Sequence, residues 1–237
     1  MTTSTDCPTF MDLRVLAEQA RPQAGADPFG ADAQILPVRA GPCEIFVAMV
    51  AGAGKACEDR GDIWIFAPVT GLVIEHDGGS VTIEPGSSAV IAKRTEFSWQ
   101  APESALIIGI RYLDAEAGGS GIFPIDNAAP LSPSNPPADD VLLSDRPVCR
   151  SNNVFRSKSG EFQCGTWDST PYQRIPIFFA HSELMHLLEG EVTFTDEAGR
   201  TATFRKGDTF IIEQGASCSW ESHERVAKIY AQYRPAP

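Results

Sequence analysis

One pattern of residues occurs twice in this chain, once in each half. The first copy, GSSAVIAKRTEFSW, begins at Gly86, and the second, GDTFIIEQGASCSW, begins at Gly207. In both copies a tryptophan follows the glycine by 13 residues and a tyrosine follows it by 26 residues. Because similar segments of this length recur more than a hundred residues apart, we expect two tandem copies of one domain rather than a solenoid of short repeats.

The segments around the repeated pattern have the character of antiparallel β-structure. Short runs of β-branched and aromatic residues alternate with glycine-rich turns, and the tight-turn sequence Asp77-Gly78-Gly79 separates two such runs. The only helical periodicity lies in residues 10–21. Strands recurring every ~8 to 12 residues without intervening helices predict an all-β protein made of two tandem jelly-roll barrels.

A change of composition separates the two predicted barrels. Residues 115–148 are rich in proline, glycine, serine and asparagine, which disfavour both helices and the ladders of a sheet. We expect this segment to be a linker. The predicted organisation is an N-terminal arm, a first barrel, the linker and a second barrel, at residues 1–35, 36–114, 115–148 and 149–237.

Charge and composition argue against several classes of function. The net charge is −12 and no Lys/Arg cluster is present, which disfavours nucleic-acid binding. The sequence has no apolar run of the ~18 residues that a membrane span needs and no secretory leader pattern, so we expect a cytoplasmic protein. Its six cysteines are scattered without a CxxC pair, which favours reduced thiols over disulfides or a structural zinc site.

The second copy carries motifs that resemble a known superfamily. ELMHLLEGEVTFTDEAG, followed by KGDTFIIEQGASCSWE, is similar to the two signature blocks of the cupins, which are jelly-roll barrels. More narrowly, GTWDSTP and the closing AKIYAQY resemble the small cupins related to ethanolamine-utilisation protein Q. The resemblance covers residues 160–233 and, through the duplication, extends more weakly to residues 45–112. It implies a two-domain, or bicupin, protein.

The resemblance implies that only part of the superfamily's metal site is present in this sequence. Metal-binding cupins use three histidines and a glutamate, a donor set suited to iron, manganese, nickel or zinc. Glu183, seven residues before Gly190, matches the glutamate. Residues 176–179 (PIFF) stand where the histidine pair would fall, and Cys218 stands in place of the third histidine. The resemblance therefore implies that the four-ligand site is broken.

Strand alternation suggests a different set of candidates. His181, Glu183 and Met185 should share one face of a strand, and Cys218 and Trp220 should share a face of another. If Glu183 points into the barrel, then His181, Glu183 and Cys218 form a candidate set of ligands for zinc or iron. Met185 and Trp220 would complete a binding pocket.

Each candidate also has an ordinary structural explanation. His181 fits a hydrogen-bonded histidine at a strand end, Cys218 fits a small buried apolar residue, and Trp220 fits core packing. Glu183 is harder to explain in this way, because an unpaired buried carboxylate costs several kcal/mol. We therefore expect Glu183 to be a ligand or a catalytic base.

The first copy provides an internal comparison. At the same spacing it has Trp64 in place of Glu183 and Phe97 in place of Cys218. Aromatic side chains thus replace the candidate ligand residues. We expect side chains to fill the first barrel and its role to be structural. Any site should lie in the second barrel.

Three functions are compatible with these features. The leading hypothesis is a bicupin that binds a small polar metabolite in its second barrel, with the first barrel supporting a homodimer. The first alternative is a metal-dependent dioxygenase, isomerase or aminohydrolase that uses Glu183, and the second is a non-catalytic sensor or scaffold. The fold alone does not choose among them, whereas metal content and bound ligands would.

Overall fold

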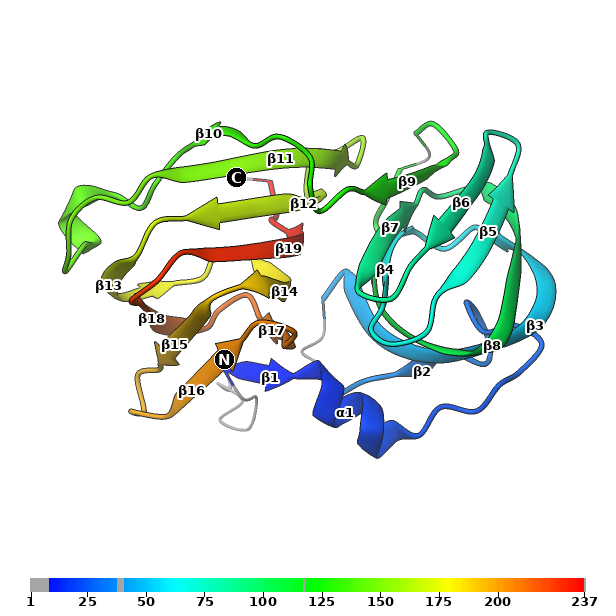
Figure 1. Cartoon of the computed structure of the whole chain (residues 1–237), viewed down its shortest axis with the longest axis horizontal. Coiled ribbons are helices and arrows are strands. Elements are labelled where there is room, and N and C mark those ends of the chain that lie inside the picture. Colours follow the sequence, from blue (N-terminus) through cyan, green and yellow to red (C-terminus); the bar gives the residue numbers. More distant parts are fainter. Residues whose placement is uncertain (1–8, 38–40, 117, 237) are drawn as a thin grey trace. The chain divides into compact units, whose positions relative to one another are not determined.

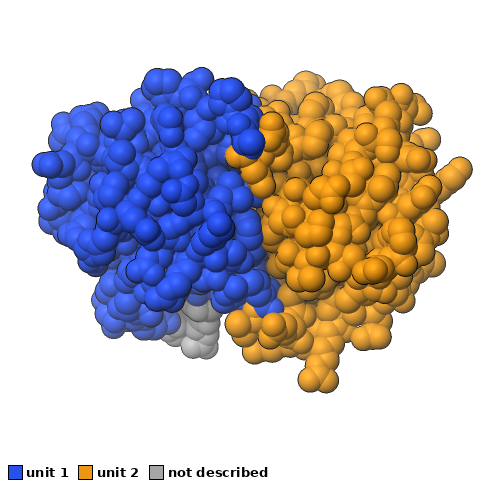
Figure 2. Space-filling view, in the orientation of Figure 1, with its two compact units in different colours: residues 1–14, 128–153, 165–237 blue, residues 15–127, 154–164 orange. Residues whose placement is uncertain are grey.

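The computed structural model describes residues 9–37, 41–116 and 118–236. The chain divides into two compact units, each discontinuous in sequence (Figures 1 and 2). Unit 1 comprises residues 1–14, 128–153 and 165–237, and unit 2 comprises residues 15–127 and 154–164. The prediction of an all-β fold is confirmed, because the described residues form antiparallel sheets and their single α-helix, α1 (Leu13–Ala20), is short. No helix in the described ranges has the length and apolar character needed to cross a membrane.

Unit 2 is built on one eight-stranded sheet, in which two long bent strands pair along most of their length. The predicted tight turn is present, with His76 opposite Gly79 in a hairpin. Gly79 has a φ of 127°, which an L-residue rarely adopts. The strands are β2 (Gln34–Ile35), β3 (Cys43–Glu58), β4 (Asp62–Ala67), β5 (Leu72–His76), β6 (Gly79–Ile83), β7 (Ser87–Ile91), β8 (Thr95–Tyr112) and β9 (Ile122–Ile125).

Unit 1 contains two sheets, of seven strands and four strands. The larger has the order β1-β17-β14-β19-β12-β11-β10, and the smaller has the order β13-β18-β15-β16. The strands are β1 (Phe10–Asp12), β10 (Ser132–Ser134), β11 (Cys149–Arg156), β12 (Phe162–Ser169), β13 (Tyr172–Phe178), β14 (Ser182–Glu189), β15 (Glu191–Thr195), β16 (Thr201–Arg205), β17 (Thr209–Ile212), β18 (Ser217–Ser222) and β19 (Val226–Tyr233).

The segments expected to be an arm and a linker form part of the sheets. β1 pairs with β17, β9 pairs with β7, and β10 pairs with β11, while residues 139–141 form the 3-10 helix η1 (Asp139–Val141). Pro124 and Pro133 lie in β9 and β10, which are edge strands of their sheets. An edge strand tolerates proline because it has one side on which no N–H is needed. The proline-rich composition therefore marks sheet edges here.

Strand pairing corrects the alignment of the two copies. Glu183 pairs with Ile212 of β17, and Ile63 pairs with Ile91 of β7. The two isoleucines are 121 positions apart, as are the two repeated glycines. The counterpart of Glu183 is therefore Ile63, and the expectation that it is Trp64 was wrong by one residue. Because neighbouring residues of a strand face opposite sides, Ile63 belongs to the core cluster of unit 2 and Trp64 does not.

The cores of the two units differ at the positions of the sequence candidates. The cluster in unit 2 contains apolar side chains throughout, among them Phe97 and Trp99. The cluster in unit 1 is also mainly apolar and aromatic, with Cys218 and Trp220 at the corresponding positions. Both units also enclose buried cations, which are Arg111 in unit 2 and Arg174 and Lys228 in unit 1. In unit 1 these cations contact two of the residues that the sequence singled out, Cys218 and Glu183.

Candidate functional site

A buried ion pair joins β14 to β19 in unit 1. Lys228 Nζ donates to Glu183 Oε1 at 2.8 Å and lies 3.2 Å from the Sδ atom of Met185. Lys228 is opposite Leu187 in the ladder, so its side chain runs along β14 to reach Glu183. The side chains of Lys228 and Glu183 are only 7 % and 12 % exposed. Both strands lie inside the seven-stranded sheet, so their neighbours limit the movement of this pair.

The surroundings of the pair keep the Glu183 carboxylate charged. Burial alone would raise the pKa of Glu183, but the Lys228 ammonium, assisted by His181, outweighs burial and lowers the pKa to about 2. The Lys228 ammonium also lies 4.8 Å from the centroid of the Trp167 ring and 5.5 Å from that of Trp220. Aromatic faces at such distances attract a cation. The carboxylate and the ammonium thus compensate each other's charge, and two tryptophan rings lie beside the ammonium.

His181 extends the ion pair toward solvent. Its Nε2 lies 3.5 Å from Glu183 Oε2, and its Nδ1 accepts a hydrogen bond from Nη2 of Arg234 at 3.1 Å. A guanidinium can only donate, so Nδ1 is unprotonated and the Nε2–H faces Glu183. The His181 side chain is 16 % exposed, and its ring lies 4.9 Å from that of Phe179. The structure therefore brings His181, Glu183 and Met185 together on one face.

Cys218 does not complete a metal site with them. It lies on β18 in the four-stranded sheet, whereas Glu183 lies on β14 in the seven-stranded sheet. Its side chain is fully buried, and burial raises the pKa of its thiol to about 11, which disfavours the thiolate that binds metals. Over the described residues, no three His, Cys, Asp or Glu side chains form a group that could hold a metal ion. The expected set of His181, Glu183 and Cys218 is therefore not assembled.

The donor set also fits a transition metal poorly on chemical grounds. Catalytic metal sites use three protein ligands with an open position, and here His181 and Glu183 would be the only two. The Lys228 ammonium already compensates the Glu183 carboxylate at 2.8 Å. Among the described residues, His181 and Glu183 therefore fall short of a transition-metal site.

Trp220 serves the core as well as the ion pair. Its ring stacks on that of Tyr172, with centroids 5.2 Å apart and planes 8° apart. Its indole N–H donates to Ser222 Oγ at 3.1 Å, so the polar atom of this ring is satisfied inside the protein. One face of Trp220 thus packs in the core while the Lys228 ammonium lies near its ring.

Two cations of this region were missed by sequence reasoning. Lys228 lies within the apolar run of β19, and Arg174 lies on β13 with 4 % exposure. Lysine and arginine are not typical metal ligands, so the metal-site pattern of the sequence did not indicate them. A charged residue inside a run of buried strand residues was the available signal, because such a residue needs a partner.

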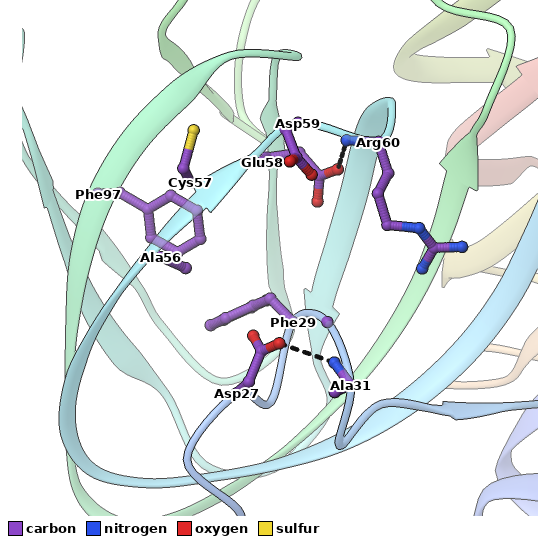
Figure 3. Close-up of a pocket in the computed structure, with 10 residues that line it drawn as sticks. Asp27, Phe29, Ala31, Ala56, Cys57, Glu58, Asp59, Arg60 and Phe97 are labelled. Carbon is purple, nitrogen blue, oxygen red and sulfur yellow. Dashed lines mark hydrogen bonds between the residues drawn. The ribbon is translucent and has the colours of Figure 1, made fainter.

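A cavity in unit 2 is a less favourable candidate. It has a volume of about 320 Å³ and lies at the end of β3 (Figure 3). Asp27 Oδ2 accepts the N–H of Ala31 at 2.8 Å, and Glu58 Oε1 accepts the N–H of Arg60 at 3.0 Å. These two carboxylates hold the backbone of their own turns. Other lining residues include Phe29, Cys57 and Phe97.

His186 lies outside this candidate site. Because it is buried, we expect it to make the free energy of unfolding depend on pH. It is 8 % exposed, and its Nδ1 lies 2.9 Å from Thr209 Oγ1. Burial, with Arg14 nearby, lowers the pKa of His186 to about 4. The unfolded chain, with a histidine pKa of ~6.5, therefore binds the proton first as the pH falls. Stability should be complete above pH ~6.5 and decline as the pH falls toward ~4.

Between pH 7 and pH 5 this decline should reach about 2 kcal/mol in urea unfolding experiments. The variant His186→Gln should lose that dependence. As a matched control, His223→Gln should keep it, because the His223 side chain is 73 % exposed. An equal pH dependence in His186→Gln and the wild type would contradict the assignment to His186.

Comparison with known proteins places the chain in a family. A family model described as the EutQ-like cupin domain matches residues 156–230. The crystal structure of a DUF861-family protein of unknown function from Pseudomonas syringae pv. tomato is 32% identical in sequence, with a TM-score of 0.81. The alignment covers 89% of this chain and 90% of that chain. The chain therefore belongs to the same family as that protein, DUF861.

More distant structures share the cupin fold alone. A cupin 2 conserved barrel domain protein from Leptotrichia buccalis is 11% identical over 99% of this chain and 100% of that chain, with a TM-score of 0.61. Salicylate 1,2-dioxygenase from Pseudaminobacter salicylatoxidans is 10% identical over 98% of this chain and 85% of that chain, with a TM-score of 0.59. The comparison with curated proteins found no match. The predicted membership of the cupin superfamily is confirmed, and the presence of two cupin domains stays a prediction.

Proposed function

We propose that this cupin binds a small organic molecule in unit 1 without a metal, at a site formed by His181, Glu183 and Lys228. The observation that carries the proposal is the charged pair of Glu183 and Lys228 beside a mainly apolar core. A buried ion pair contributes little net stability, because desolvation of both charges offsets their attraction. Its presence beside a partly accessible histidine is better explained by ligand recognition than by folding.

The chemistry of the site suits a molecule with both polar and apolar parts. Glu183 offers acceptor oxygens, Lys228 offers donors, and His181 presents a polar edge nearest the solvent. The Trp167 and Trp220 rings beside the ammonium provide apolar contact area. A few converging polar groups among aromatic side chains are typical of small-molecule sites.

A metal-dependent enzyme using zinc or iron is the competing function. Salicylate 1,2-dioxygenase shares the fold, but a fold hosts many chemistries. In this chain a cation is already present at the glutamate, as the side chain of Lys228. Elemental analysis of tag-free protein is therefore expected to find far less than one zinc or iron per chain. One tightly held metal per chain, lost in Glu183→Gln, would favour the enzyme instead.

Ligand binding is tested by screening small polar metabolites for thermal stabilisation and measuring the affinity of each hit by calorimetry. We expect Glu183→Gln to weaken binding of the hits by about tenfold or more, because hydrogen bonds to a charged group are about twice as strong as neutral ones. Glu221→Gln is the matched control, since the Glu221 side chain is 48 % exposed, and it should leave binding unchanged. Hits that bind Glu183→Gln as tightly as the wild type, or a screen without hits, would refute the proposed site.

A further inference from the structure

Arg174 differs from the other buried cations of the protein. Arg111, Arg174 and Lys228 are the three buried Lys or Arg side chains among the described residues. Arg111 forms an ion pair with Glu58, and Lys228 forms one with Glu183. Arg174 forms no ion pair with a carboxylate of the described ranges, and its Nη1 donates instead to the carbonyl oxygens of Cys218 at 2.7 Å and Ile175 at 3.2 Å. Its positive charge is therefore not balanced by an acid.

The geometry of a guanidinium makes this arrangement informative. A guanidinium has five N–H donors in one plane, and two parallel N–H groups match the two oxygens of a carboxylate. Backbone carbonyls anchor Nη1 of Arg174 and so orient the group. They carry no net charge, so a buried cation held in this way attracts an anion.

Arg174 belongs to the same neighbourhood as the proposed site. Its guanidinium carbon lies 5.6 Å from the centroid of the Phe179 ring. The centroid of the His181 ring lies 4.9 Å from that of Phe179, so Phe179 connects Arg174 to His181. Trp220 provides a second connection, because it is the ladder partner of Arg174 and its ring centroid lies 5.5 Å from the Lys228 ammonium. Arg174 and Lys228 thus bring two buried cations to this neighbourhood, and the Glu183 carboxylate pairs with one of them.

We propose that the ligand of unit 1 is an organic monocarboxylate that also carries a hydroxyl group. This inference rests on the proposed function. Arg174 binds the carboxylate of the ligand, whose negative charge pairs with the guanidinium. Glu183 accepts a hydrogen bond from the hydroxyl group of the ligand. A second carboxylate at this position would be repelled by Glu183, and an amine would be repelled by the nearby Lys228 ammonium. The aromatic rings contact the apolar part of the ligand.

Mandelate, its uncharged amide mandelamide, and phenylacetate, which lacks the hydroxyl, are suitable probes for calorimetry. We expect mandelate to bind the wild type about tenfold or more tightly than either of the other two, because each lacks one charged hydrogen bond. In Arg174→Gln the preference for mandelate over mandelamide should disappear. Arg174→Lys, which keeps the charge but loses the planar fork, should bind mandelate more weakly than the wild type and still prefer it to mandelamide.

Arg146→Gln is the matched control, because the Arg146 side chain is 57 % exposed and pairs with Asp139, and it should bind all probes as the wild type does. Circular dichroism establishes that each variant is folded. If Arg174→Gln does not fold, Arg174→Lys replaces it as the test variant. Equal binding of mandelate and mandelamide to the wild type, or an unchanged preference in Arg174→Gln, would overturn the inference. If the inference is overturned but the binding of screening hits still depends on Glu183, the proposed function stands without the monocarboxylate assignment. The absence of binding by every probe would also overturn the monocarboxylate assignment.

Discussion

The variant Lys228→Met is expected to lower the free energy of unfolding by about 3–5 kcal/mol, the usual cost of removing one partner of a buried ion pair. Methionine has a similar length but leaves the Glu183 carboxylate, 12 % exposed, without its ammonium. The measurement is urea unfolding followed by tryptophan fluorescence. The folded variant should also show a raised Glu183 pKa, since the Lys228 charge is what outweighs burial.

A double variant separates the charge effect from lost packing. Lys228→Met combined with Glu183→Gln should recover most of the lost stability, because no charge is left buried without a partner. As a matched control, Lys158→Met should cost less than about 1 kcal/mol, since Lys158 pairs with Glu116 at the surface and is 60 % exposed. A double variant less stable than Lys228→Met would show that the ion pair is not the cause.

Arg111→Leu is expected to destabilise unit 2 by a similar amount, about 3–5 kcal/mol. Arg111 is fully buried, its Nη2 lies 3.1 Å from Glu58 Oε2, and the same nitrogen donates to the carbonyl oxygen of Phe29. The substitution leaves the Glu58 side chain, 3 % exposed, as an uncompensated charge. It also removes the donor that holds the loop containing Phe29.

Arg60→Leu provides the comparison for Arg111. Arg60 binds Glu44 at 2.6 Å, but its side chain is 42 % exposed, and surface pairs of this kind contribute less than about 1 kcal/mol. Urea unfolding of the two variants should therefore differ by at least about 2 kcal/mol. Equal losses in both variants would contradict the role assigned to burial.

The fold was largely predictable because its signals are local or repeated. The duplicated spacing and the Asp77-Gly78 turn depend on neighbours along the chain, and both correspond to observed strands and hairpins. The error at Trp64 arose because Ile63 precedes Gly71 by eight residues, whereas Glu183 precedes Gly190 by seven. A shift of one residue exchanges the faces of a strand, and only the pairing of Ile63 with Ile91 reveals the correct register.

The candidate site was predictable only within a single strand. Alternation places His181, Glu183 and Met185 on one face, and the structure brings these three together. Alternation does not indicate which strands are neighbours, and this decides both that Cys218 belongs to the other sheet and that Lys228 of β19 reaches Glu183. The partners of Glu183 were therefore set by tertiary structure.

The discontinuity of the two units has an evolutionary consequence. β1 (Phe10–Asp12) supplies an edge strand to the larger sheet of unit 1, although most of that unit lies after residue 127. Residues 154–164 in turn belong to unit 2. A chain divided near residue 127 would leave β17 with an unpaired edge, a template for aggregation, and would deprive unit 2 of a segment. A single crossover near residue 127 would therefore not transfer either unit intact, so recombination cannot exchange the two units as separate cassettes.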